Sequence, residues 1–217
     1  MHASPTLSPS RKLVEVTGLS NAEFIDRHAG PGRVGLVGGG DWLSRAIRFA
    51  QRHATDDHKS SQWAHAFLFS GKRTDGKHWV MESDLDIHRH HWRLGTQENR
   101  ADKYYDNDKC AQIAILDFHL TPAQELAVIN SGLDLVAGMT RYSVRELVGT
   151  LLALRKPALR SRDNLLQREG ALYCSAMVQH CFAAADIAFM PGVTQKNTTP
   201  QDVFATPVAH TAYVLVR

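Results

Sequence analysis

The order of apolar and polar residues along the chain predicts several strands. A short apolar run at 34–37 follows a Gly-Pro-Gly turn, which is typical of a buried strand. The segments 63–69 and 78–82 are apolar and are joined by a polar loop that contains two glycines, so we expect a β-hairpin. Residues 112–118 and 208–216 predict two further strands, the second closing the sheet.

Helix caps and helical periodicity predict the remaining elements. Ser20 with Glu23 and Thr121 with Gln124 are capping-box patterns, and Pro122 suits the first turn of a helix. The predicted helices cover 22–28, 42–53 after a Gly-rich turn, 122–137, a segment opened by Ser143 with Glu146, and 172–186. Helices and strands follow each other irregularly, so we expect an α+β fold in which a mainly antiparallel sheet packs against helices.

Length and composition indicate one soluble globular core. The chain has 217 residues, of which 43% are hydrophobic and 22% are charged, so general disorder and fibrous repeats are excluded. We expect an N-terminal tail and short helix over 1–32 and the main domain over 33–217. The net charge of +3 does not favour a dedicated nucleic-acid-binding protein, and the basic stretch at 141–170 is interpreted as a solvated face.

Targeting and membrane segments are not indicated by the sequence. The N-terminus lacks the apolar region of a signal peptide, and no run approaches the length of a membrane span. We therefore expect a cytoplasmic protein with no membrane span. The three cysteines form no CxxC pair and are too few for a disulfide framework, which agrees with a reducing compartment.

Cys174 is the first candidate for chemistry, because it lies at the start of the helix predicted at 172–186. The unpaired N–H groups and the dipole of a helix N-terminus favour a thiolate, and the N–H of Cys174 itself suits a developing oxyanion. Cys181 lies inside the same helix, and we interpret it and Cys110 as buried structural residues.

His65 and Glu82 are the candidate partners of that thiol. His65 interrupts an otherwise apolar strand, where a purely structural residue would be aliphatic. If Ser70 pairs with Lys77 in the hairpin, His65 lies opposite Glu82 and Phe67 lies opposite Val80 on one face of the sheet. A shift of one residue would move Glu82 to the other face, so both registers stay open.

Other polar motifs have weaker functional interpretations. The glycines at 38–40 match no phosphate-loop spacing, and Asp41 is expected to cap the following helix. The histidines within 88–91 lie near acidic residues but lack metal-ligand spacing, so we expect an exposed polar segment and no metal. Residues 88–110, which include Tyr104 and Tyr105, suit a loop that covers a substrate.

Four segments, taken in order, resemble the permuted papain-like hydrolases of the NlpC/P60 superfamily, specifically the YiiX/YebB-like group. They are Gly40-Asp41 before a helix with Ser44 and Ile47, Ala64-His65-Ala66, Met81-Glu82-Ser83, and Leu172 to Val178 around Cys174. Thr199 to Val203 is similar to the closing segment of this family. The resemblance runs from about 34 to 216.

The resemblance implies a circularly permuted papain-like fold in which the cysteine-bearing helix has moved to the C-terminal half. It implies Cys174 as nucleophile, His65 as base and Glu82 as the third polar residue. Tyr173 and Asp41 are secondary candidates, although a packing ring is the favoured interpretation of Tyr173. No cofactor is needed for this chemistry, and we expect none.

The expected function is a cysteine hydrolase of amide bonds, a peptidase or amidase that acts on a small peptide-like or cell-wall-derived substrate. Two alternatives remain open from the sequence: a lipid acyltransferase or thioesterase of the same fold, and a noncatalytic protein that binds a peptide or acyl ligand. No nucleic-acid partner is expected, and the sequence indicates no oligomeric state.

Overall fold

The structure is a computed structural model that describes residues 11–38, 61–86, 93–138 and 174–217. The helices predicted at 42–53 and after Ser143 lie outside these residues, as do the histidines at 88–91 and the basic stretch at 141–170. Only the backbone is described for 84–86 and 93–94.

A seven-stranded sheet forms the centre of the molecule, with the order β1-β7-β6-β2-β3-β4-β5. Neighbouring strands run antiparallel except β1 and β7, which are parallel. The strands are β1 Arg11–Thr17, β2 Val34–Gly38, β3 His65–Lys72, β4 His78–Asp86, β5 Arg93–Arg100, β6 Gln112–Asp117 and β7 His210–Val216. The predicted α+β fold with a mainly antiparallel sheet is confirmed.

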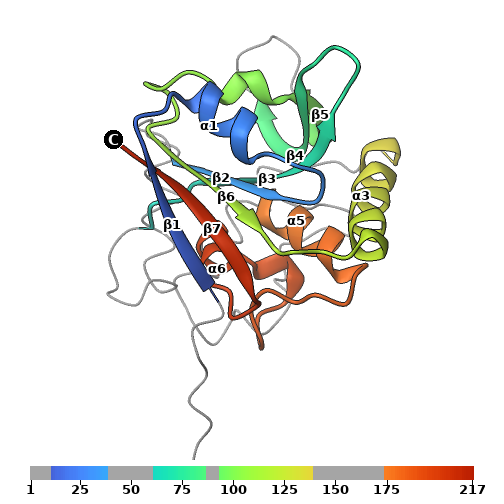
Figure 1. The fold of residues 1–217 in the computed structure, drawn as a ribbon. Coiled ribbons are helices and arrows are strands. Elements are labelled where there is room, and N and C mark those ends of the chain that lie inside the picture. The colour runs from blue at the N-terminus through green and yellow to red at the C-terminus, as the bar shows by residue number, and fades with distance from the viewer. Residues whose placement is uncertain (1–10, 39–60, 87–92, 139–173) are drawn as a thin grey trace, which may run out of the picture.

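Helices cover both faces of this sheet (Figure 1). They are α1 Asn21–His28, α3 Pro122–Ala137, α5 Cys174–Ala183 and α6 Pro200–Phe204, with 3-10 turns η2 Ala101–Tyr104 and η4 Gln195–Asn197. One apolar core joins α3, α5 and α6 to the sheet, and a second core joins α1 and η2 to the opposite face. This three-layer arrangement buries the central strands on both sides, which accounts for their apolar runs.

The predicted helix caps at Ser20 and Thr121 are confirmed. In each case the cap hydroxyl accepts the N–H of the third helical residue, and the side chain of that residue returns to the backbone N–H of the cap. Thr199 with Asp202 forms a further capping box before α6. These caps satisfy orphan donors and set where the helices begin.

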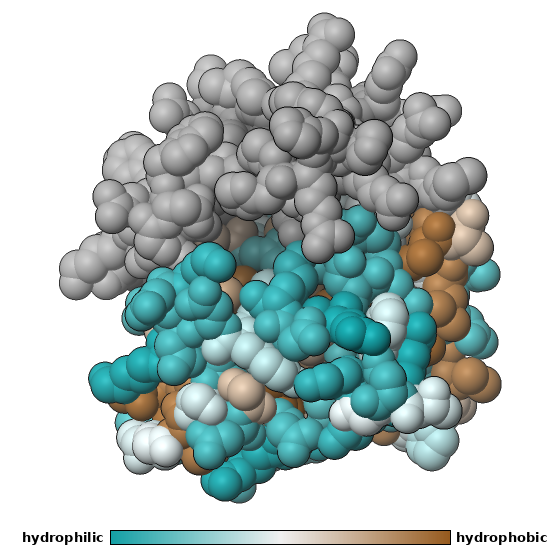
Figure 2. Space-filling model, turned by 90° about the horizontal axis from the view of Figure 1, so that it is seen from above, coloured by the Kyte–Doolittle hydropathy of each residue, from teal (hydrophilic) through white to brown (hydrophobic). Residues whose placement is uncertain are grey.

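The outer side of α3 carries two exposed leucines. Leu126 and Leu133 are 61% and 39% exposed, while Val128 and Gly132 on the inner side of the helix are buried. Figure 2 shows hydrophobic atoms along the edge of the molecule where α3 lies.

Residues 11–32, which were expected to form only a tail and a short helix, also contribute a strand to the sheet. Arg11–Thr17 pairs along its whole length with β7 as the edge strand β1, and Phe24 and Ile25 of α1 are completely buried. The charged residues at 11, 12 and 15 hid this strand, because Arg11 and Lys12 are adjacent and interrupt the alternation of apolar and polar side chains.

The register predicted for the β3–β4 hairpin is wrong by two residues. Phe69, rather than Phe67, lies opposite Val80, and a β-bulge follows between Phe69 and Gly71. The strands extend to Lys72 and His78, so the connecting loop is shorter than the sequence suggested. Because a shift of two preserves the alternation of side chains, Glu82 stays on the same face as His65, one diagonal step away.

Residues 93–110 of the segment expected to cover a substrate are instead part of the body of the protein. Residues 93–100 form β5, and η2 follows with Ala101 and Tyr104 buried. The polar residues Glu98 and Asn99 of this edge strand contact Ser70 and Glu82.

Candidate active site

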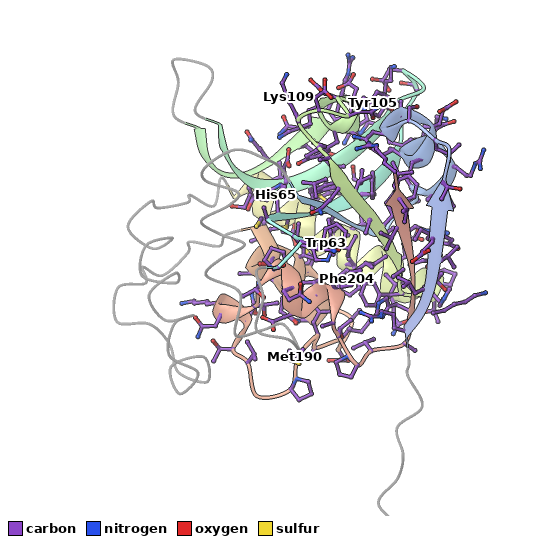
Figure 3. The ribbon with its side chains drawn as sticks, turned by 90° about the vertical axis from the view of Figure 1, so that its left-hand side faces the viewer. Trp63, His65, Tyr105, Lys109, Met190 and Phe204 are labelled. Carbon is purple, nitrogen blue, oxygen red and sulfur yellow. The ribbon has the colours of Figure 1, made fainter. Side chains whose placement is uncertain are left out.

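Cys174 is the first residue of α5, as the sequence predicted. The next eight residues of this helix are nearly all buried against β3 and β4, so the helix start is held at the sheet. Cys174 is half-buried, whereas Cys110 and Cys181 are buried. In Figure 3, His65 of β3 lies beside the end of α5.

The three thiols have different electrostatic environments. Burial alone would raise the pKa of Cys174, but the charge and hydrogen bond of His65, together with hydrogen bonds from the backbone N–H groups of Ala66 and Ser175, lower it. Burial raises the pKa of Cys110 to about 11 and that of Cys181 to about 12. Cys174 is therefore the thiol whose surroundings favour the reactive thiolate.

His65 connects Cys174 to Glu82. Its Nε2 lies 2.9 Å from Oε2 of Glu82, and the side chain of His65 is 18% exposed while that of Glu82 is 0% exposed. Because Nε2 is engaged by the carboxylate, Nδ1 is the ring nitrogen left for the thiol. Strands β3 and β4 and helix α5 thus bring the three predicted residues into one chain of contacts.

Both oxygens of Glu82 are held by further donors. Asn99 Nδ2 and Lys103 Nζ each lie 2.7 Å from Oε1. The hydroxyl of Tyr104 donates to Oε2, the same oxygen that His65 contacts. With four donors around it, the carboxylate has no freedom to turn away from the imidazole.

These contacts keep Glu82 ionised in a buried place. Burial by itself would raise its pKa, but the hydrogen bond from His65 and the positive charge of Lys103 lower it strongly. A carboxylate that accepts several charge-assisted bonds stays anionic even when it is removed from water.

An aromatic stack supports this arrangement from the sheet. The ring of Tyr104 lies on that of Phe67 with centroids 4.3 Å apart and planes 5° apart. Gly35 of β2 leaves room for Phe67, since a Cβ on Gly35 would lie 2.1 Å from the Phe67 ring. The absence of a side chain at residue 35 is thus a requirement of the stack.

The sequence did not identify Asn99, Lys103 or Tyr104 as site residues. Their roles depend on the β4–β5 register, in which Val80 lies opposite Asn99, and on the turn that brings η2 under the sheet. The one signal was the run of polar and aromatic residues after β5. Tyr173 and Asp41, the secondary candidates, lie outside the described residues.

Two cavities lie at opposite ends of the central strands. One of about 440 Å³ is lined by Arg33, Asp117, His119 and Glu125, at the end of β2 away from His65. The other, of about 290 Å³, is lined by Trp63, Gln112 and residues 214–217. Gln112 pairs with Gly38 and Val37 pairs with His65, so this smaller cavity lies at the same end of the sheet as the imidazole.

The fold and site define an α+β protein with a thiol, an imidazole and a carboxylate in contact at one end of its sheet. Its architecture is that of the YiiX-like group. The structure is similar to the crystal structure of the metalloprotein YiiX from Escherichia coli O157:H7, of the DUF1105 group, with a TM-score of 0.54 and 12% identity. The match covers 85% of this chain and 96% of YiiX.

Sequence comparisons add no further relative. No family model matches the chain, and no curated protein matches it by sequence. The similarity to YiiX therefore establishes the fold, and the chemistry of the chain has to be argued from its own residues.

None of the helices in the described residues combines the length and the apolar character needed to cross a bilayer. The same residues contain no group of three or more His, Cys, Asp and Glu side chains that could hold a metal ion.

Proposed function

We propose that the chain is a cysteine hydrolase of amide bonds, with Cys174 as nucleophile, His65 as general base and acid, and Glu82 as the residue that orients His65. The observation that carries the proposal is the continuous contact from a half-buried thiol of lowered pKa through His65 to a fully buried, ionised Glu82. Nucleophile, base and orienting group in this order are the minimal set for acyl transfer through a thiol.

The reaction starts with the thiolate of Cys174 and the protonated imidazole of His65. The sulfur attacks the carbonyl carbon of the amide, and the C=O electron pair moves to oxygen. Backbone N–H groups at the start of α5 are suited to stabilise this oxyanion. The C–N bond then breaks as His65 gives its proton to the leaving amine, and a thioester with Cys174 remains.

Hydrolysis of the thioester restores the site. Neutral His65 takes a proton from water, the oxygen of that water attacks the thioester carbonyl, and the C–S bond breaks to release the acid. Glu82 accepts the Nε2–H of His65 throughout, so the ring keeps one orientation while Nδ1 faces the sulfur. Glu82 itself stays ionised and transfers no proton.

The chain order of the site agrees with a circularly permuted papain-like fold, which we include in the proposal. The strands that carry His65 and Glu82 precede the cysteine helix α5 in this chain. Catalysis depends on geometry rather than on chain order, so the permutation leaves the roles unchanged.

The solved structure that resembles this chain is described as a metalloprotein, and that description applies to YiiX. In this chain His65 contacts Glu82 through one ring nitrogen, and Glu82 is already occupied by Lys103, Asn99 and Tyr104. The described residues converge on no common point as metal ligands do, so they do not fit a metal centre. No step of the mechanism runs through a metal.

The proposed substrates are small peptide-like amides or fragments derived from cell walls. Incubating the native protein with a panel of peptide p-nitroanilides and short-chain acyl p-nitrophenyl esters, followed by acid quenching and peptide mapping by mass spectrometry, tests the proposal. We expect an acyl adduct on Cys174 and turnover of an amide, both absent in Cys174→Ala and retained in Cys181→Ala.

Two results of this experiment would overturn the proposal: no adduct on Cys174 with any member of the panel, or equal modification of all three cysteines. Adducts from esters that pass to an added amine or alcohol rather than to water would instead favour acyl transfer.

A further inference from the structure

A lysine is an unexpected neighbour for the carboxylate that orients a catalytic histidine. Lys103 Nζ lies 2.7 Å from Oε1 of Glu82, while His65 Nε2 lies 2.9 Å from Oε2 of the same carboxylate. One carboxylate is thus shared between a permanent cation and an imidazole that gains and loses a proton. The charge on Lys103 opposes the charge on His65 across Glu82.

The contact of Lys103 with Glu82 also affects the protonation of the His65 imidazole. A carboxylate with no other cation would stabilise the protonated form of His65 and raise its pKa. Lys103 offsets part of the negative charge, so the imidazolium is held less firmly. A base that must accept a proton and return it in each cycle works best when its pKa lies near the working pH.

We propose that Lys103 sets the proton affinity of His65 through Glu82 and is a positioning residue of the active site. This inference rests on the proposed function, because it assigns a catalytic role to His65. Within the part of the chain that the structure describes, the ionisable groups around His65 and Lys103 include Cys174 of α5, Glu82 of β4 and Tyr104 of η2. The charge of Lys103 also acts on the thiol of Cys110. Asn99 of β5 completes the shell without charge.

The expected change in the pKa of His65 follows from the distances between Lys103, Glu82 and His65. The two contacts place the ammonium within about 8 Å of the imidazole, where a unit charge at intermediate dielectric shifts a pKa by about one unit. Lys103 is 35% exposed, so solvent screens part of its charge, whereas Glu82 is 0% exposed. We therefore expect loss of the lysine charge to raise the pKa of His65 by about one unit.

Three variants of Lys103 separate charge from contact. Lys103→Met keeps the aliphatic chain without charge, Lys103→Gln keeps a hydrogen-bond donor without charge, and Lys103→Arg keeps the charge. Lys109→Met is the matched control, because Lys109 lies in the same segment, is 80% exposed and pairs with Asp106. Figure 3 shows Lys109 at the outer end of the molecule, away from His65.

The measurement is an NMR titration of the imidazole signals in histidine-labelled native protein, with His65 assigned from His65→Gln. The pKa of His65 should rise by about one unit in Lys103→Met and Lys103→Gln and stay near that of the wild type in Lys103→Arg and Lys109→Met. If Lys103→Met does not fold, Lys103→Gln carries the test.

An unchanged or lowered pKa of His65 in the uncharged variants would overturn the inference, as would an equal rise in Lys109→Met. Iodoacetamide labelling of wild-type Cys174 separates this from the proposed function. Labelling at acidic pH that depends on His65, combined with no effect of Lys103, removes the lysine inference alone. Loss of that labelling in the wild type removes the proposed function itself.

Discussion

Removing the hydroxyl of Tyr104 tests how much the shell of Glu82 contributes to stability. Tyr104→Phe deletes one donor to a completely buried carboxylate and leaves the ring stacked on Phe67. A hydrogen bond to a buried charged group contributes about 1.5–3 kcal/mol, so we expect the free energy of unfolding to fall by about 2 kcal/mol. The pKa of Glu82 should also rise, because one of the bonds that favour its ionised form is lost.

The assay is equilibrium unfolding in urea at neutral pH, with Tyr105→Phe as the matched control. Tyr105 is the next residue along the chain and is half-buried, and Nζ of Lys77 lies 6.0 Å from the centroid of its ring. The charges that act on its hydroxyl are those of Asp102, Asp26 and Lys72, so the control should lose less than about 0.5 kcal/mol. Equal losses in both variants, or a loss below about 0.5 kcal/mol in Tyr104→Phe, would refute the reasoning.

Three further predictions concern the site and its support. Glu82→Gln should retain more activity than His65→Ala, because orienting the imidazole is a smaller task than transferring the proton; steady-state kinetics on any substrate found would contradict this if the order were reversed. Gly35→Ala should destabilise the protein by about 3 kcal/mol in urea unfolding, since its Cβ would collide with the Phe67 ring, and a loss below about 1 kcal/mol would show that the ring relaxes easily. Burial lowers the pKa of His28, His78 and His210, so their folded-state pKa values lie below those of the unfolded chain. The contribution of these histidines to stability is complete above pH of about 6.5 and is lost as the pH falls through their depressed pKa values. The urea midpoint should therefore be higher at pH 8 than at pH 5.5, and equal midpoints would contradict this prediction.

The central strands and the helix caps could be predicted from the sequence because each has a local signal. Val34 to Val37 are apolar since both faces of β2 are covered, and Ser20 and Thr121 show capping patterns within four residues. β1 could not be predicted in the same way. Its pairing partner β7 lies almost 200 residues away in the chain, and its own alternation is interrupted by the adjacent charged residues Arg11 and Lys12.

The three central site residues were also within reach of the sequence, for different reasons. Cys174 has a helix start, and His65 is a polar residue in an apolar strand. Glu82 was placed correctly on the face of His65 even though the register was wrong, because an error of two residues preserves the face. Asn99, Lys103 and Tyr104 could not be found, since their approach to Glu82 depends on the β4–β5 register and on the turn after β5.

The most direct test of the central claim is the pH dependence of iodoacetamide labelling at each cysteine of the native protein, from pH 4 to pH 10, in the wild type and in His65→Ala. We predict that Cys174 reacts at acidic pH in the wild type, that His65→Ala moves this reactivity to alkaline pH, and that Cys110 and Cys181 stay unreactive. Ordinary thiol reactivity of Cys174 that is unchanged by His65→Ala would contradict the thiolate–imidazole site.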